Sequence, residues 1–200
     1  MMKNPLRKRL PRELKDEIGK YLVVFLLMIG TIGMVSGFLV ADGSMLKAYH
    51  ESFEKYNIED GNFRTGEKVY RGQKEAIEEQ GVKIYENYYR EESLTNGSTM
   101  RFFKNREKVD KVCIMEGKAP EKTGEIAIDR MYADNNGLKL GATLRSGDKT
   151  WKIVGLIALS DYSALFQNNN DSMFDAVKFG VSVVTAEEFD SLDQEKLQYN

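Results

Sequence analysis

The chain has 200 residues, with 29 basic and 31 acidic side chains and a formal net charge of −2 at pH 7. Its single cysteine, Cys113, excludes an internal disulfide, and its single histidine, His50, has no second histidine with which to form a metal-binding pair. No CxxC, HExxH, GxSxG or GxxxxGK[ST] motif occurs in the sequence. We therefore expect a protein that is not an enzyme and that holds no cofactor and no metal.

An uncharged segment of 21 residues lies near the N-terminus, at positions 21–41. As a helix it would cover roughly 31 Å at ~1.5 Å per residue, which is close to the thickness of a bilayer core. Twelve of these residues are Leu, Ile, Val or Phe, the side chains that favour insertion. The segment predicts a transmembrane helix. The alternative is a cleaved signal peptide, but its apolar region would be only about 7–15 residues long.

The distribution of charge predicts the orientation of this helix. Residues 1–20 carry seven basic and three acidic side chains, a balance of +4, whereas residues 42–200 carry 22 basic and 28 acidic ones, a balance of −6. Basic residues that flank a span stay on the cytoplasmic side. The N-terminal segment should therefore be cytoplasmic, as either an amphipathic interfacial helix or an unstructured basic signal. The acidic remainder should be extracytoplasmic, and it gives no reason to expect nucleic acid.

Two features indicate what the helix does. Gly30, Gly33 and Gly37 recur on one face, where glycine costs helix stability unless another helix packs closely. The alternative is that glycine is simply common in membrane helices. Residues 42–57 then keep a helical spacing of apolar side chains and lack the Gly, Ser and Pro of a flexible linker. We expect a stalk helix there, with Leu46, Tyr49, Phe53 and Tyr56 as its stalk residues.

Residues 58–200 read as a mixed α+β extracytoplasmic core domain. The pattern predicts an α+β lobe over 58–114 and 160–200, and a β-barrel-like lobe over 115–159, where short strands alternate with glycine turns. Asn96-Gly97 between two extended runs predicts a hairpin. We expect strands at 82–92, 98–104, 108–115, 124–128, 142–145, 150–157 and 179–184, helices at 68–80 and 130–135, a capping box from Thr185 to Glu188, and a buried Cys113.

A series of short motifs between positions 115 and 156 adds a family resemblance. In order, these are Glu116-Gly117-Lys118 with Pro120, Gly124-Glu125-Ile126, Gly137-Leu138-Lys139-Leu140-Gly141 and Ile153-Val154-Gly155. Behind an apolar span and a helical stalk, this order resembles the extracytoplasmic core domain of FtsX-like (MacB-type) ABC transporter permeases. The start of the chain, Asn4-Pro5-Leu6-Arg7-Lys8, also looks like the cytoplasmic start of such permeases.

The resemblance implies a permease subunit in the plasma membrane of a bacterium, which transmits ATP-driven motion to the outer domain. Its implied partners are a separate ABC ATPase subunit, a second permease subunit or half, and membrane lipid. The substrate stays open among a lipid, a lipoprotein, a peptide and a drug. Because the family has further spans, we expect this chain to be a fragment of a longer permease or a truncated product. The first alternative is a single-pass, signal-anchored extracytoplasmic module that binds a ligand or the cell wall. The second alternative is a membrane-anchored enzyme.

Overall fold

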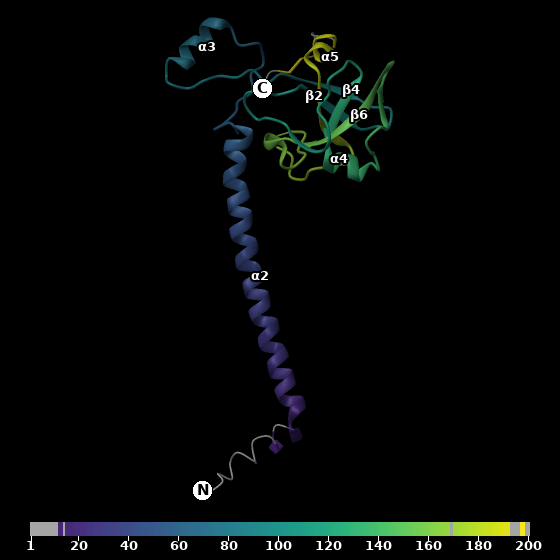
Figure 1. Ribbon diagram of the computed structural model, residues 1–200. Coiled ribbons are helices and arrows are strands. Elements are labelled where there is room, and N and C mark those ends of the chain that lie inside the picture. Colours follow the sequence, from purple (N-terminus) through teal and green to yellow (C-terminus); the bar gives the residue numbers. More distant parts are fainter. Residues whose placement is uncertain (1–11, 14, 169, 193–196, 199–200) are drawn as a thin grey trace. The chain divides into compact units, whose positions relative to one another are not determined.

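The computed structural model describes residues 12–13, 15–168, 170–192 and 197–198 (Figure 1). The chain divides into two compact units, Met1–Glu51 and Ser52–Asn200, and each is described by itself. Most of the predicted cytoplasmic segment 1–20, including Asn4 to Lys8, lies outside the described residues.

The first unit is dominated by helix α2 (Ile18–Tyr56), which runs for 39 residues into the second unit without a break. The helix includes the whole predicted span at 21–41 and all but the last residue of the predicted stalk at 42–57. None of its residues is buried. Thr31 Oγ1 donates to the carbonyl oxygens of Leu27 and Met28, so the hydroxyl is satisfied inside the apolar segment. Within the described ranges, α2 is the one helix that is long and apolar enough to cross a membrane.

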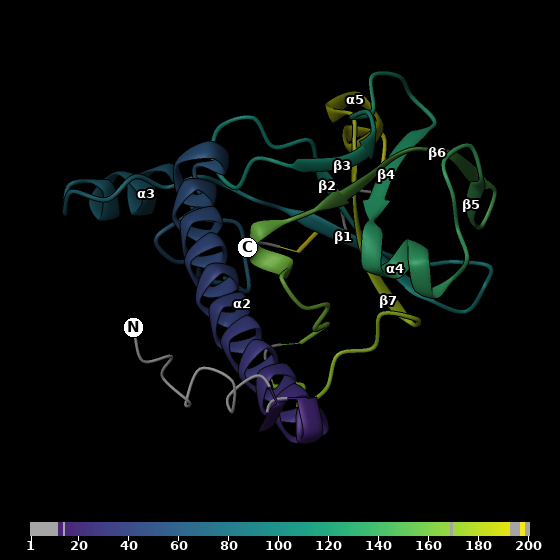
Figure 2. The ribbon, with the colours of Figure 1, turned by 60° about the horizontal axis from the view of Figure 1, so that its bottom comes forward.

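The second unit contains a seven-stranded mixed sheet (Figure 2). Its strand order is β1-β2-β7-β4-β6-β3, and β5 also pairs with β6. The pairs β2–β7 and β4–β6 are parallel, and the others are antiparallel. The strands are β1 (Tyr89–Ser93), β2 (Thr99–Lys104), β3 (Cys113–Gly117), β4 (Glu125–Asp129), β5 (Thr143–Ser146), β6 (Lys149–Ala158) and β7 (Phe179–Val184).

Short helices connect or follow these strands: α3 (Arg71–Glu78), α4 (Arg130–Asn135), the 3₁₀ helix η1 (Ser160–Tyr162) and α5 (Ala186–Asp190). The carboxylate of Asp129 accepts from the Tyr132 backbone N–H and so caps the start of α4. Thr185 Oγ1 accepts from the Glu188 backbone N–H and caps α5, but only half of the predicted capping box forms, because the Glu188 carboxylate binds Gly124 and Trp151 instead. The predicted bounds of α4 and β7 are both confirmed.

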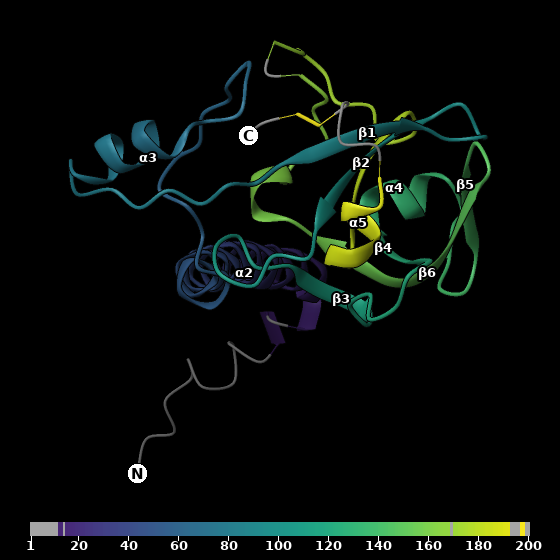
Figure 3. The same cartoon turned by 90° about the horizontal axis from the view of Figure 1, so that it is seen from above.

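The predicted hairpin is confirmed, because β1 and β2 pair antiparallel across a turn in which Gly97 has φ +83°. The β-barrel-like lobe over 115–159 is not confirmed. The sheet does not close into a barrel, because its end strands β1 and β3 do not pair and lie apart (Figure 3). In addition β4, from the expected barrel, pairs with β7, from the expected α+β lobe. Strand periodicity cannot reveal such a pairing, because the two strands are far apart in the sequence.

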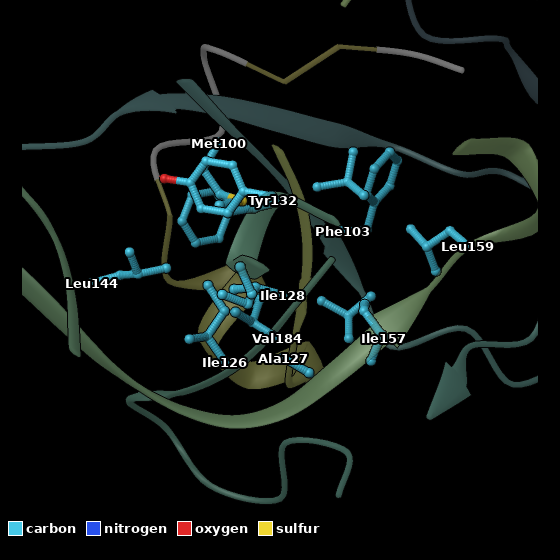
Figure 4. Close-up of a cluster of buried hydrophobic side chains, with 14 of the residues drawn as sticks. Met100, Phe103, Ile126, Ala127, Ile128, Tyr132, Leu144, Ile157, Leu159 and Val184 are labelled. Carbon is cyan, nitrogen blue, oxygen red and sulfur yellow. The ribbon is translucent and has the colours of Figure 1, made fainter. Parts of the chain in front are cut away.

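The core lies around β7, all six residues of which are buried. Aromatic and aliphatic side chains from β2, β4, β6 and α4 pack there, among them Met100, Ile128 and Tyr132 (Figure 4). The ring centroids of Phe102 and Trp151 lie 4.9 Å apart. Gly117 and Gly155 are paired across β3 and β6. A Cβ atom on Gly117 would clash with the Val154 carbonyl oxygen, and one on Gly155 with the Lys118 carbonyl oxygen. Close backbone approach therefore explains two glycines of the 115–156 motif series.

Glu188 provides a test of this packing, because it is 4% exposed and its carboxylate serves two donors. It accepts from Trp151 Nε1 at 3.2 Å and from the Gly124 backbone N–H at 3.0 Å. Glu188→Ala should leave both donors unsatisfied and lower the free energy of unfolding by about 2–4 kcal/mol. Trp151 is the only tryptophan, so its fluorescence reports denaturant unfolding of the full chain directly. The neighbouring Glu187 is exposed, so Glu187→Ala should change the free energy of unfolding little. If both variants lost the same free energy of unfolding, the two hydrogen bonds of Glu188 would not be what stabilises this packing.

Candidate functional site

The C-terminal end of α2 is hydrogen-bonded to a loop of the sheet domain, and this contact lies wholly within the unit Ser52–Asn200. The backbone N–H of Lys111 donates to the Tyr56 carbonyl oxygen at 2.8 Å, and that of Asp110 donates to the Asn57 carbonyl oxygen at 3.0 Å. The last carbonyl groups of a helix have no N–H donor within the helix. The loop amides therefore provide hydrogen bonds that water or a capping residue would otherwise provide. We call the helix end, the loop at 105–112 and η1 the α2 junction.

Asn57 ends the helix in a left-handed conformation, with φ +49°. The Ile58 backbone N–H then donates back to the Phe53 carbonyl oxygen at 3.1 Å, as in glycine-type helix ends. Asparagine is one of the few side chains that tolerate this conformation. Its Nδ2 also donates to the Lys108 carbonyl oxygen at 2.6 Å. One residue therefore both stops the helix and binds the loop.

The Tyr56 side chain joins the helix end to the edge strand β3. Its hydroxyl donates to Cys113 Sγ at 3.0 Å. The prediction that Cys113 is buried in the core is wrong, because the residue is half-buried on a strand that pairs only with β6. The apolar alternation of this segment was misleading, since Ile114 and Met115 on the same strand are exposed.

Asp110 connects three segments of the junction. It is 2% exposed and left-handed, with φ +48°. Its Oδ1 accepts from the Glu59 backbone N–H at 3.2 Å and from Ser160 Oγ at 2.8 Å. The chain leaving α2, the loop after β2 and η1 after β6 are thus held by one carboxylate.

A buried ion pair fixes the same loop to η1. Arg106 donates from both terminal nitrogens to Asp161, at 2.7 and 2.9 Å, and the two side chains are 6% and 7% exposed. The guanidinium also lies 4.4 Å from the centroid of the Phe103 ring. Bidentate geometry and an aromatic face are what an arginine needs to offset the cost of burial.

A second buried arginine extends this network away from the junction. Arg101 donates to the Tyr162 hydroxyl at 2.7 Å and to the Gln167 carbonyl oxygen at 2.8 Å, and it also pairs with Glu91. Its guanidinium carbon lies 4.1 Å from the centroid of the Tyr89 ring. Burial raises the pKa of the Tyr162 hydroxyl, while Arg101 opposes that shift. Because η1 is bound on one side by Arg106 and on the other by Arg101, it cannot shift without breaking buried charged contacts.

This arrangement suits mechanical attachment. The described part of the chain has no group of three or more His, Cys, Asp and Glu side chains placed to hold a metal ion. The polar contacts of the junction instead join elements that are 50 or more residues apart, as in the pairs Asn57–Lys108 and Arg106–Asp161. Such contacts attach the helix end to the sheet domain.

The residues predicted from the sequence are only partly brought together. Gly30, Gly33 and Gly37 lie on α2, and a Cβ atom added to any of them would meet nothing within 4 Å among the described residues. Their role in helix packing stays a prediction. The stalk residues Leu46, Tyr49 and Phe53 are 52%, 58% and 40% exposed, whereas Tyr56 reaches β3.

The sequence reasoning missed Asn57, Arg106, Asp110 and Asp161 as junction residues. Asn57 had a usable signal, because an asparagine at the end of a helical apolar pattern is a known type of C-terminal cap. The others had none. Arg106 and Asp161 are 55 positions apart, and nothing local to either one indicates a buried partner.

Comparison with known proteins gave little. No family model and no curated protein matches the chain. One solved structure, a domain of a presumed permease protein from Porphyromonas gingivalis, aligns at 15% identity with a TM-score of 0.32. The alignment covers 62% of this chain and 64% of that one, so the chain spans less than two thirds of that structure. A TM-score of this size does not establish a common fold.

The buried ion pair generates a stability prediction. Arg106→Met should leave the Asp161 carboxylate buried without its counter-ion and cost about 3–5 kcal/mol of unfolding free energy. Adding Asp161→Leu to this variant should recover most of the loss, because no unpaired charge then remains. Denaturant unfolding of the full chain measures both.

The exposed pair Arg71–Glu75 is the matched control, since its side chains are 92% and 57% exposed. Arg71→Met should cost less than about 1 kcal/mol. A double variant as unstable as Arg106→Met alone would mean that the pair is not what stabilises the junction.

Proposed function

We propose that this chain is part of a permease subunit of an ABC-type transporter, in which α2 conveys motion from the membrane to an extracytoplasmic domain. The observation that carries the proposal is the continuity of α2. The same helix contains the apolar segment 21–41 and ends in hydrogen bonds from Asp110 and Lys111 to its last carbonyl groups. A displacement of the span then has a stiff route into the sheet.

Both ends of this route meet the physical requirement for transmission. A helix changes direction as a unit, whereas a Gly/Ser-rich linker of the same length behaves as a random coil and loses the direction of a tilt. Between the span and the junction, α2 contains no proline and one glycine, Gly43. At the junction, the Arg106–Asp161 pair and the Asp110 contacts prevent the loop from moving independently of η1.

The remaining parts of the proposal rest on the sequence. No phosphate-binding motif occurs, so ATP hydrolysis is assigned to a separate ABC ATPase subunit. The basic segment 1–20 supports a cytoplasmic N-terminus, and Gly30, Gly33 and Gly37 support a face for a second permease subunit or half. The bacterial plasma membrane is implied by the family resemblance. The FtsX-like resemblance of residues 115–156 joins these features into one function.

The proposed orientation can be measured by thiol labelling. In a chain whose Cys113 is replaced by Ala, a cysteine at Lys15 should be protected from a membrane-impermeant maleimide in intact cells. A cysteine at Asp148, which is exposed, should react under the same conditions. Permeabilised cells, in which both positions should react, are the control. Labelling at Lys15 with protection at Asp148 would reverse the proposed topology.

The proposed transmission is tested by softening the stalk. A Gly/Ser segment of equal length in place of residues 46–53 should leave expression, membrane insertion and the ATPase activity of the partner subunit largely intact. The variant should lose the cellular transport or resistance phenotype that is also lost when the gene is deleted, because a flexible chain carries no torque.

An alanine-rich helical segment of the same length is the matched control, and it should retain the phenotype. Both variants keep residues 54–57, which include the Tyr56 and Asn57 groups that bind β3 and the loop at 105–112. If the Gly/Ser variant retains the phenotype at equal protein level, stalk transmission is refuted, and a passive module that binds ligand or cell wall is favoured.

A further inference from the structure

Three acidic residues, Glu59, Asp110 and Asp161, lie together at the α2 junction. The Glu59 backbone N–H donates to Asp110 Oδ1, which places Glu59, three positions after the end of α2, beside the buried aspartate. Asp161 approaches through η1, whose Ser160 hydroxyl donates to the same oxygen of Asp110. Asp161 has a bidentate partner in Arg106. Glu59 and Asp110 have no ion-pair partner among the described residues.

The surroundings of Glu59 add little positive charge. Asn62 Nδ2, from its own segment, donates to Glu59 Oε1 at 2.5 Å. Charged side chains of neighbouring segments also line the cavities that Glu59 lines. Three of the basic ones are already paired with another carboxylate: Lys74 with Glu86, Lys104 with Asp190, and Arg106 with Asp161. The remaining charged residues, Lys83, Glu107 and Lys108, are exposed. The last carbonyl groups of α2 contribute the negative end of the helix dipole. An ionised Glu59 therefore lies in unfavourable surroundings.

Titration of Glu59 follows from this geometry. Burial raises its pKa, Asp110 and Asp161 raise it further, and the bond from Asn62 opposes the shift. A folded pKa above the unfolded one means that ionisation weakens the folded arrangement. The penalty is fully present above the raised pKa, and it disappears as the pH falls below the ordinary value for a glutamate. Acidification should therefore strengthen the junction.

We propose that the α2 junction is a pH-sensitive contact, in which Glu59 takes up a proton and tightens the attachment of the helix end. The protonated carboxyl group becomes a donor beside the Asp110 carboxylate and removes one of two adjacent negative charges. Protons reach it from solvent, because Glu59 lines a cavity of about 490 Å³. In the acid form, the loop at 105–112 is held more firmly against Tyr56 and Asn57. An effect of this tighter attachment on the motion that α2 conveys rests on the proposed function. The pH sensitivity of the contact does not rest on it.

Hydrogen exchange of two backbone amides measures this contact directly. The amides of Asp110 and Lys111 donate to the helix end, so they exchange when the junction opens. In the full chain in detergent, their protection, corrected for the intrinsic pH dependence of exchange, should rise at least about twofold from pH 8 to pH 5. Glu59→Gln should give the high protection at every pH. Asp110→Asn, a second variant, should weaken the pH dependence without removing it, because burial and Asp161 still act on Glu59.

Two controls make the outcome unambiguous. Glu116→Gln changes an exposed carboxylate on β3 and should keep the wild-type pH dependence. The Thr99 amide, which donates to the Lys178 carbonyl oxygen at 2.7 Å, should show constant protection in every variant and so report that the sheet is folded. Protection at Asp110 and Lys111 that does not vary with pH in the wild type, or that varies equally in Glu59→Gln, would overturn the proposal. Neither result depends on the stalk experiment.

Discussion

The carbonyl groups at the end of a long helix need donors that the helix cannot provide, and in this protein the sheet domain provides them. The amides of Asp110 and Lys111 bind the last carbonyl groups of α2, and Asn57 turns the chain so that they can. This requirement places the loop at 105–112, which must leave β2 and reach the helix end. The position of that loop then determines where η1 can lie.

Buried charge keeps this arrangement in one conformation. Arg106 binds Asp161 and Arg101 binds the Tyr162 hydroxyl, so two consecutive residues of η1 are held by two arginines of the same region of the chain. Burying such groups costs desolvation energy, and replacing them with apolar side chains is often neutral. Their contribution here is geometric, because each guanidinium accepts only one orientation of its partners. Glu59 is the exception, since its ionised form finds no comparable partner.

The junction contacts come from segments that leave two strands running in opposite directions in the mixed sheet. The loop at 105–112 follows β2, and η1 follows β6, although two strands, β7 and β4, lie between them in the sheet. Central β7 is buried along its whole length and fixes the spacing of its neighbours. Gly117 and Gly155 allow β3 and β6 to approach closely at the same edge. A junction that joins the chain leaving α2 to both loops is therefore attached to the core and not to a mobile surface segment.

Several features of the fold could be predicted from residues close together in the sequence. Apolar composition and helical spacing indicated α2, Asn96-Gly97 indicated the β1–β2 turn, and Thr185 indicated the start of α5, because each depends on residues within a few positions of one another. Other features could not be predicted in this way: β4 pairs with β7 in an open sheet, Cys113 lies on an edge strand, and Arg106 binds Asp161. These contacts join segments about 50 or more residues apart. Which segments meet depends on how the whole chain packs its core, and no local pattern of residues encodes it.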